Sequence, residues 1–122
     1  MRLWHPKYDV GRATEAIAEG LAIKLGTNDG NYDLVDATTD IVHGFAVNAT
    51  TKAGEDIEFY REGGDAVGVS GGTITRGARL SVNASGKLVA NSTDNDPVIG
   101  YAYDAASAAD QKVRFNFTRH SV

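Results

Sequence analysis

The chain carries the same apolar pattern twice, at a fixed spacing along the sequence. The matched pairs are Gly44 and Gly100, Phe45 and Tyr101, Ala46 and Ala102, Ile57 and Val113, and Phe59 and Phe115. No set of reactive side chains recurs with them. A period as long as the step from Gly44 to Gly100 matches neither common solenoids nor propeller blades. We therefore expect two copies to form one pseudo-symmetric β-barrel or sandwich, in a structural or binding protein rather than an enzyme.

Short alternating segments predict β-strands in both copies. We expect strands at residues 21–25, 32–35, 41–47, 57–61, 66–69, 80–82, 88–89, 98–103 and 113–117. Clusters of Asn, Asp and Gly between them predict tight turns, because these residues tolerate positive φ. With 122 residues, this is a single domain by length. The sequence predicts a mainly β domain at 19–122, with pseudo-repeats at about 19–62 and 76–119.

Two segments have helix-forming composition. Residues 104–110 are rich in alanine, the best helix former, but they span only about two turns between strands, so we expect a turn or a single helical turn. Residues 13–18 are long enough for one helical turn, which is too short to be stable alone.

Residues 1–18 differ from the rest and predict an extended N-terminal arm. This stretch holds the only Trp, Trp4, and shows no clean strand alternation. Within its first twelve residues, Arg2, Lys7 and Arg12 oppose only Asp9. We interpret it as an arm that is ordered by contact with a neighbouring molecule. The alternative is that Trp4 caps the core of its own domain. Three basic side chains are few for nucleic-acid binding, which we do not expect.

The composition excludes several kinds of site. Without cysteine there are no disulfides, thiolate metal sites or Cys nucleophiles. The histidines, His5, His43 and His120, lack local metal-ligand spacing, and we expect His43 to be a core or inter-subunit residue. The Ser70 turn lacks the pattern of a nucleophile elbow. We therefore expect no catalytic residues, no metal and no cofactor.

The polar and acidic segments also have simpler interpretations. An EF-hand that began at Asp29 would need Gly at position six and Glu at position twelve, where Leu34 and Asp40 stand. Nine acidic residues between 29 and 65 are most simply a solvated face. Apolar runs fall short of the roughly 20 residues that cross a bilayer, and residues 1–7 lack the apolar stretch of a signal peptide. We expect that the protein does not contact a membrane. We also expect that it is made in a cytoplasm.

The second copy contains a series of short motifs that resembles a known family. In order they are Val-Gly-Val-Ser-Gly-Gly-Thr-Ile-Thr-Arg-Gly at 67–77, Gly-Lys-Leu-Val at 86–89 and Ile-Gly-Tyr-Ala at 99–102, followed by the alanine segment and a final strand. This series is similar to the small capsid cement or decoration proteins of tailed bacteriophages. The resemblance covers about residues 66–118, and the Ile-Thr-x-Gly opening is shared by related β-clip domains.

The resemblance implies a compact β-barrel or sandwich, β-clip or β-tulip-like, without catalytic residues. It implies a homotrimer on the outer surface of a virion capsid, made in the host bacterial cytoplasm. Its partner would be the major capsid protein, whose neighbouring subunits it would cement against the pressure of packed DNA. The residues we expect to bind the capsid belong to the arm: Arg2, Leu3, Trp4, His5, Pro6, Lys7, Tyr8 and Arg12.

The alternative is another phage structural module or a glycan-binding β module. A glycan site would use exposed aromatic rings, for which the sequence offers five tyrosines. They are Tyr8, Tyr32, Tyr60, Tyr101 and Tyr103. Strand alternation favours half-buried positions for these rings, which argues against the glycan site.

Overall fold

The computed structural model describes residues 5–91 and 98–120, and this part of the chain consists of strands and turns. The first five strands are β1 (Tyr8–Ala13), β2 (Ala22–Leu25), β3 (Asn31–Leu34), β4 (Gly44–Ala46) and β5 (Asp56–Arg61). The next five are β6 (Gly64–Val69), β7 (Arg79–Val82), β8 (Leu88–Ala90), β9 (Val98–Ala102) and β10 (Lys112–His120). The mainly β prediction is confirmed, but each copy forms its own five-stranded unit instead of sharing one barrel with the other. Within these residues no helix has the length and apolarity to cross a membrane.

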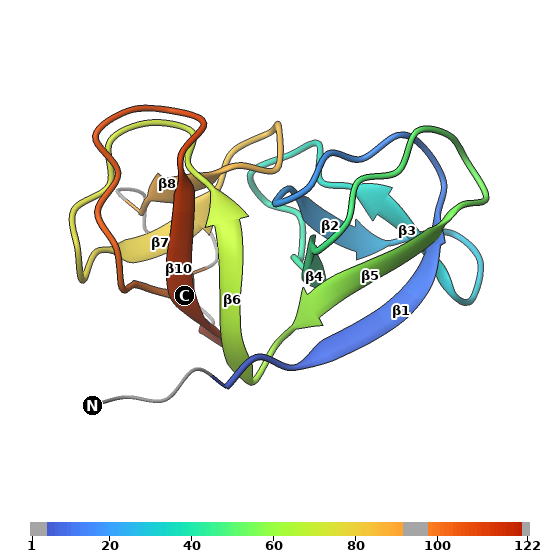
Figure 1. The fold of residues 1–122 in the computed structure, drawn as a ribbon, viewed down its shortest axis with the longest axis horizontal. Helices are drawn as coiled ribbons and strands as arrows, with labels where there is room; N and C mark the ends of the chain where they lie inside the picture. Colours follow the sequence, from blue (N-terminus) through green and yellow to red (C-terminus); the bar gives the residue numbers. More distant parts are fainter. Residues whose placement is uncertain (1–4, 92–97, 121–122) are drawn as a thin grey trace.

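The strands form two five-stranded units that lie side by side (Figure 1). In the first unit the order β1-β3-β2-β4-β5 closes into a barrel, because β5 also pairs with β1. In the second unit the order is β6-β10-β9-β7-β8, and a bridge between Ser70 and Leu88 joins its two ends. We refer to these as the first and second barrels.

The duplication seen in the sequence extends to all five strands of each unit. Gly44 pairs with Arg61 in the first barrel, and Gly100 pairs with Phe117 in the second, so both members of the pair recur at the spacing of the repeat. The isolated bridge between Ile17 and Thr50 recurs between Ile74 and Ala106. Strand β1 corresponds to β6 at the same spacing. Each copy therefore begins earlier than predicted, at β1 and β6 rather than at residues 19 and 76.

The structure differs from the predicted arm over residues 8–18. Here β1 pairs along its length with β5 and in parallel with β3. Its inward positions hold Gly11 and Ala13, so no large apolar side chains alternate to mark the strand. A Cβ on Gly11 would lie 2.1 Å from the Tyr32 ring, which fills this space instead. Ile17 is buried and bridges Thr50, so the single helical turn considered for 13–18 is absent.

Residues 104–110 form turns and a bridge, in agreement with the turn prediction rather than with a helix. Ala106 exchanges backbone hydrogen bonds with Ile74 at 2.9 and 2.8 Å. Small side chains allow this close crossing, and Ala106 is buried. The predicted strand at 41–47 is shorter than expected, because β4 covers only Gly44–Ala46.

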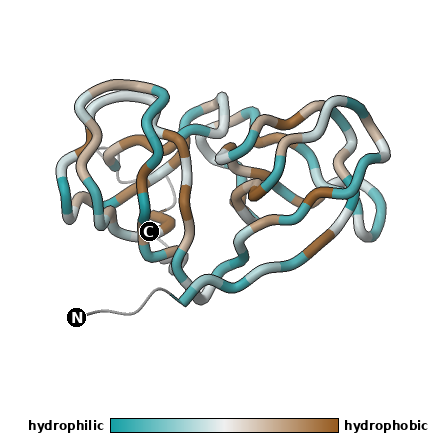
Figure 2. The backbone as a smooth tube through the Cα atoms, viewed as in Figure 1, coloured by the Kyte–Doolittle hydropathy of each residue, from teal (hydrophilic) through white to brown (hydrophobic). Residues whose placement is uncertain are grey.

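Apolar residues concentrate on the strands of both barrels (Figure 2) and pack into two cores. The core of the first barrel includes Ile23, Ile57 and Phe59. The larger core is centred on the second barrel, but Phe45 of β4 enters it and makes edge-to-face contacts with Phe115 and Phe117, with ring centroids 4.9 and 5.2 Å away. The first barrel thus contributes a side chain to the core of the second.

Backbone contacts fix the junction between the barrels. Ala22 N donates to Gly86 O at 2.8 Å, and Val69 N donates to Gly20 O at 3.2 Å. Both bonds join backbone groups of the two copies, so the barrels are connected by hydrogen bonds as well as by the shared core.

Candidate binding surface

The described end of the predicted arm lies against the start of β6. The backbone N–H of His5 donates to Asp65 Oδ2 at 2.9 Å, and Asp65 N donates to His5 O at 3.0 Å. Pro6 forms a parallel bridge with Asp65. The phenol of Tyr103 donates to Asp65 Oδ1 at 2.7 Å, and Asp65 is only 1% exposed. Residues 5–7, which we call the arm base, are thus joined to the second barrel before the chain enters β1.

The eight predicted site residues fall into three groups. Arg2, Leu3 and Trp4 lie outside the described residues. The arm base and Tyr8 form one continuous, largely exposed segment beside β6. Arg12 is exposed at the other end of β1, about 13 Å away at the usual rise of a strand, where it pairs with Asp56 of β5. The structure therefore groups His5, Pro6, Lys7 and Tyr8 and separates Arg12 from them.

An exposed aromatic and apolar strip adjoins the arm base. Tyr8 is 47% exposed and packs against Tyr60 of β5, with ring centroids 5.2 Å apart and the ring planes tilted by 35°. Val10, on the same face of β1, is 58% exposed. Tyrosine is enriched at protein interfaces, so exposed tyrosine rings on an outer strand face mark a candidate interface. Tyr8, Val10 and Tyr60 form what we call the outer strip.

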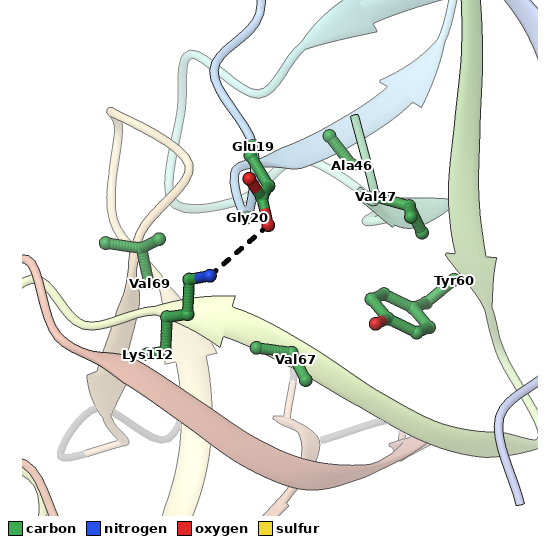
Figure 3. A pocket seen from close by; sticks show the side chains of 8 residues that line it. All are labelled: Glu19, Gly20, Ala46, Val47, Tyr60, Val67, Val69 and Lys112. Carbon is green, nitrogen blue, oxygen red and sulfur yellow. Dashed lines mark hydrogen bonds and ion pairs between the residues drawn. The ribbon is translucent and has the colours of Figure 1, made fainter. Parts of the chain in front are cut away.

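A crease of about 180 Å³ separates the two barrels next to Tyr60 (Figure 3). Its apolar lining comes from Val47 of the first barrel and from Val67 and Val69 of β6. Lys112 Nζ lies 3.4 Å from Glu19 Oε1 across the crease. Both side chains are exposed, so this ion pair contributes little to stability.

A second, more polar hollow of about 340 Å³ lies at the end of the first barrel. Asp9, His43, Arg61 and Glu62 line it. The His43 ring lies 5.2 Å from that of Tyr32 and 5.6 Å from that of Phe59. His43 is half-buried, with its ring against the first core and on the lining of the hollow, so it is not a fully buried core residue, and the inter-subunit alternative stays a prediction. Among the described residues no three His, Cys, Asp or Glu side chains gather as a metal site would require.

The acidic side of the first barrel is partly neutralised by Lys24. Its Nζ lies 2.7 Å from Asp36 Oδ1 and 3.1 Å from Asp40 Oδ2. The hydrogen bond to Asp36, followed by the one to Asp40, raises the pKa of Lys24. Asp40 Oδ2 also accepts the backbone N–H groups of Asp36 and Ala37, both at 3.0 Å. The Asp40 carboxylate therefore closes the turn at residues 36–40, and Asp36 adds an ion pair with Lys24.

We expect Asp104→Asn to lower the stability of the protein at neutral pH and to make that stability less sensitive to a fall in pH. The Arg114 side chain donates two hydrogen bonds of 2.9 Å to Asp104, and these bonds hold the pKa of that carboxyl below its ordinary value of 3.8. A depressed folded-state pKa gives stability that is present above 3.8 and is lost as the pH falls through the folded-state pKa.

Urea unfolding of both proteins at several pH values measures this effect. The difference in the free energy of unfolding between wild type and Asp104→Asn should narrow as the pH falls below 3.8. A difference that stays constant over that range contradicts the assignment.

Three residues of the arm contact were missed by the sequence prediction. The segment Glu62-Gly63-Gly64-Asp65 has the composition of a turn, and Asp65 was counted with the solvated acidic face. In the structure Gly64 and Asp65 begin β6, and Asp65 is buried. Tyr103 was predicted as a strand residue and named among the candidate glycan-site tyrosines, but no contact with the arm was expected for it. A signal was present in the duplication, since Gly64 stands where the first copy has Tyr8.

Comparison with known proteins adds evidence of a different kind. A family model described as phage cement protein matches residues 5–117. A crystal structure of the N base of the head fiber protein gp8.5 of bacteriophage phi29 matches with a TM-score of 0.70 and 18% identity, over 96% of this chain and 98% of that chain. At this identity the match shows a common fold. None of the curated proteins is similar in sequence.

Proposed function

Because the chain belongs to the phage cement protein family, we propose that it binds the outer surface of a phage capsid as a homotrimer and joins neighbouring subunits of the major capsid protein. The family establishes a structural, capsid-associated role. The finer assignment includes a position on the shell exterior, synthesis in the host bacterial cytoplasm and no catalytic activity. Cementing subunits against the pressure of packed DNA requires binding at several points and no chemistry.

The observation that carries this proposal is the arm base beside an exposed aromatic strip on a rigid double barrel. Tyr8 and Tyr60 offer a pair of rings in contact, and Lys7 adds a positive charge to the same region. We propose that the eight arm residues named from the sequence, Trp4 foremost, contact the capsid, since Trp, Tyr and Arg are enriched among interface hot spots. Three copies of a modest contact would bind tightly through high effective concentration.

A glycan-binding module remains the second candidate, and one observation favours it. Tyr8 and Tyr101 are 47% and 44% exposed, as sugar-stacking rings need to be. Against it, Tyr32 is buried in the first core and Tyr103 is bonded to Asp65. A glycan array with reproducible hits that are lost in Tyr8→Ala would establish this function instead.

Deletion of residues 1–4 is expected to weaken capsid binding by about 100-fold, the scale of losing one hot-spot side chain. The deletion leaves all ten described strands intact, because β1 begins at Tyr8. A longer deletion through residue 12 would remove most of β1 and open the first barrel, so it would not isolate the arm. Co-sedimentation with expanded capsids, over a range of protein concentrations, measures the change.

The matched control is Leu25→Ser, which alters an exposed apolar side chain at the far end of β2. It should bind as the wild type does. Undiminished binding by the deletion variant contradicts the role of the arm. Light scattering tests the trimer separately, and a protein that is monomeric both in solution and on the shell excludes it.

A further inference from the structure

We propose that Gly64, Asp65 and Tyr103 form a clasp that positions the arm for capsid binding. The clasp fixes the point at which residues 1–4 join the folded barrel. This inference rests on the proposed function of the arm, and it assigns positioning residues outside the arm itself.

The first support is the reciprocal bonding at Asp65. His5 of the arm base makes two hydrogen bonds with Asp65. The His5 N–H donates to the Asp65 carboxylate at 2.9 Å, and the His5 carbonyl accepts from the Asp65 N–H at 3.0 Å. The second carboxylate oxygen accepts the Tyr103 hydroxyl at 2.7 Å. A carboxylate that is 1% exposed is stable only when its oxygens have such donors. The arm base therefore supplies one of the donors that the buried Asp65 carboxylate requires.

The second support is steric and independent of charge. A Cβ on Gly64 would lie 2.6 Å from His5 O and 3.0 Å from Lys7 N, which are both backbone atoms. Neither atom can yield by a simple rotation of a side chain. Only glycine at this position lets the arm base cross the start of β6.

The third support is a difference between the two copies. Gly64 and Asp65 occupy the positions that Tyr8 and Asp9 hold in the first copy. Asp9 is exposed, and its Oδ1 accepts the N–H of its neighbour Val10 at 2.8 Å. The residue type thus departs from the repeat at Gly64, and the Asp that both copies carry is buried only in the second copy, where the arm base crosses. A scaffold that needed only a β-core would not require this departure.

The expected benefit of the clasp is preorganisation. An arm whose base is already ordered loses less conformational entropy when it binds, and each residue fixed in advance is worth roughly tenfold in affinity. With the arm base released, we expect capsid binding to weaken by about 10- to 100-fold.

Gly64→Val is the decisive variant, because it blocks the crossing by sterics and leaves every hydrogen-bonding group present. The expected result is amide exchange at His5 at least about tenfold faster, together with the loss of capsid affinity, while most of the folded barrel remains. Gly72→Val is the matched control, since nothing lies within 4 Å of its Cβ position, and it should match the wild type in both measurements.

Asp65 variants separate a positioning role from a merely structural one. Asp65→Asn should retain slow His5 exchange and binding, since its amide oxygen accepts from His5 and its amide nitrogen donates to the Tyr103 oxygen. Asp65→Ala should lose both. If amide exchange at His5 stays slow in Gly64→Val, the proposed clasp is contradicted. If that variant exchanges rapidly yet binds as the wild type does, the positioning role is overturned.

The proposed function fails by a different result. If deletion of residues 1–4 leaves binding unchanged, the arm does not bind the capsid. The exchange rate at His5 still decides in that case whether the clasp holds the arm base.

Discussion

Gly100→Ala is expected to destabilise the protein by about 4 kcal/mol or more, the range reserved for forced backbone changes. Gly100 has φ of 149°, which side-chain-bearing residues rarely adopt. An added Cβ would lie 1.6 Å from Asn116 O, a backbone atom of the neighbouring strand β10. Relief requires separation of β9 from β10 where Gly100 pairs with Phe117. Equilibrium urea unfolding followed by circular dichroism measures the loss.

Gly72→Ala serves as the matched control for this substitution. Its Cβ position is open within 4 Å, so the expected change is within about 1 kcal/mol of wild type, in the stabilising direction if its backbone suits alanine. A Gly100→Ala protein whose stability lies within that same range would show that the β9–β10 pairing is wrong.

Phe45→Ala is expected to cost about 3–5 kcal/mol, the usual range for removal of a buried phenylalanine. Phe45 is 0% exposed and loses its contacts with Phe115 and Phe117. The substitution should affect both barrels, because Phe45 belongs to the first barrel and its side chain fills the core of the second. We therefore expect wild type and variant each to unfold in a single transition.

Tyr101→Ala is the natural control for Phe45→Ala, because Tyr101 occupies the corresponding position in the second copy. Tyr101 is 44% exposed, and its removal should cost less than about 1 kcal/mol. Equal losses of stability for the two substitutions would contradict the arrangement of the cores. Two separate unfolding transitions in the wild type contradict the shared core.

The strands could be predicted where apolar side chains alternate with polar ones. Ile57 and Phe59 in β5 and Val113 and Phe115 in β10 are buried as their alternation indicated. Strand β1 carried no such signal. Its inward positions hold Gly11 and Ala13, and the Tyr32 ring fills the space above Gly11.

The candidate site was only partly accessible to the same reasoning. Composition identified the basic, Trp-containing arm, whereas the contact that holds its base depends on tertiary structure. Asp65 is acidic and follows two glycines, so local pattern assigns it to a turn on the surface. Its burial results from residues 60 positions before it and 38 positions after it in the chain. No local pattern contains that information.

The bridge between Pro6 and Asp65 has a practical consequence for engineering. Asp65 also pairs with Asn116 of β10, so the arm base and the middle of the last strand lie on either side of β6. A foreign peptide inserted next to Gly64 would lie beside the surface proposed to meet the shell and would compete with docking. The turn that includes Gly72, past the opposite end of β6 from the arm base, is a better insertion point, because nothing lies within 4 Å of its Cβ position. Particles decorated through that turn would present their cargo without sacrificing attachment.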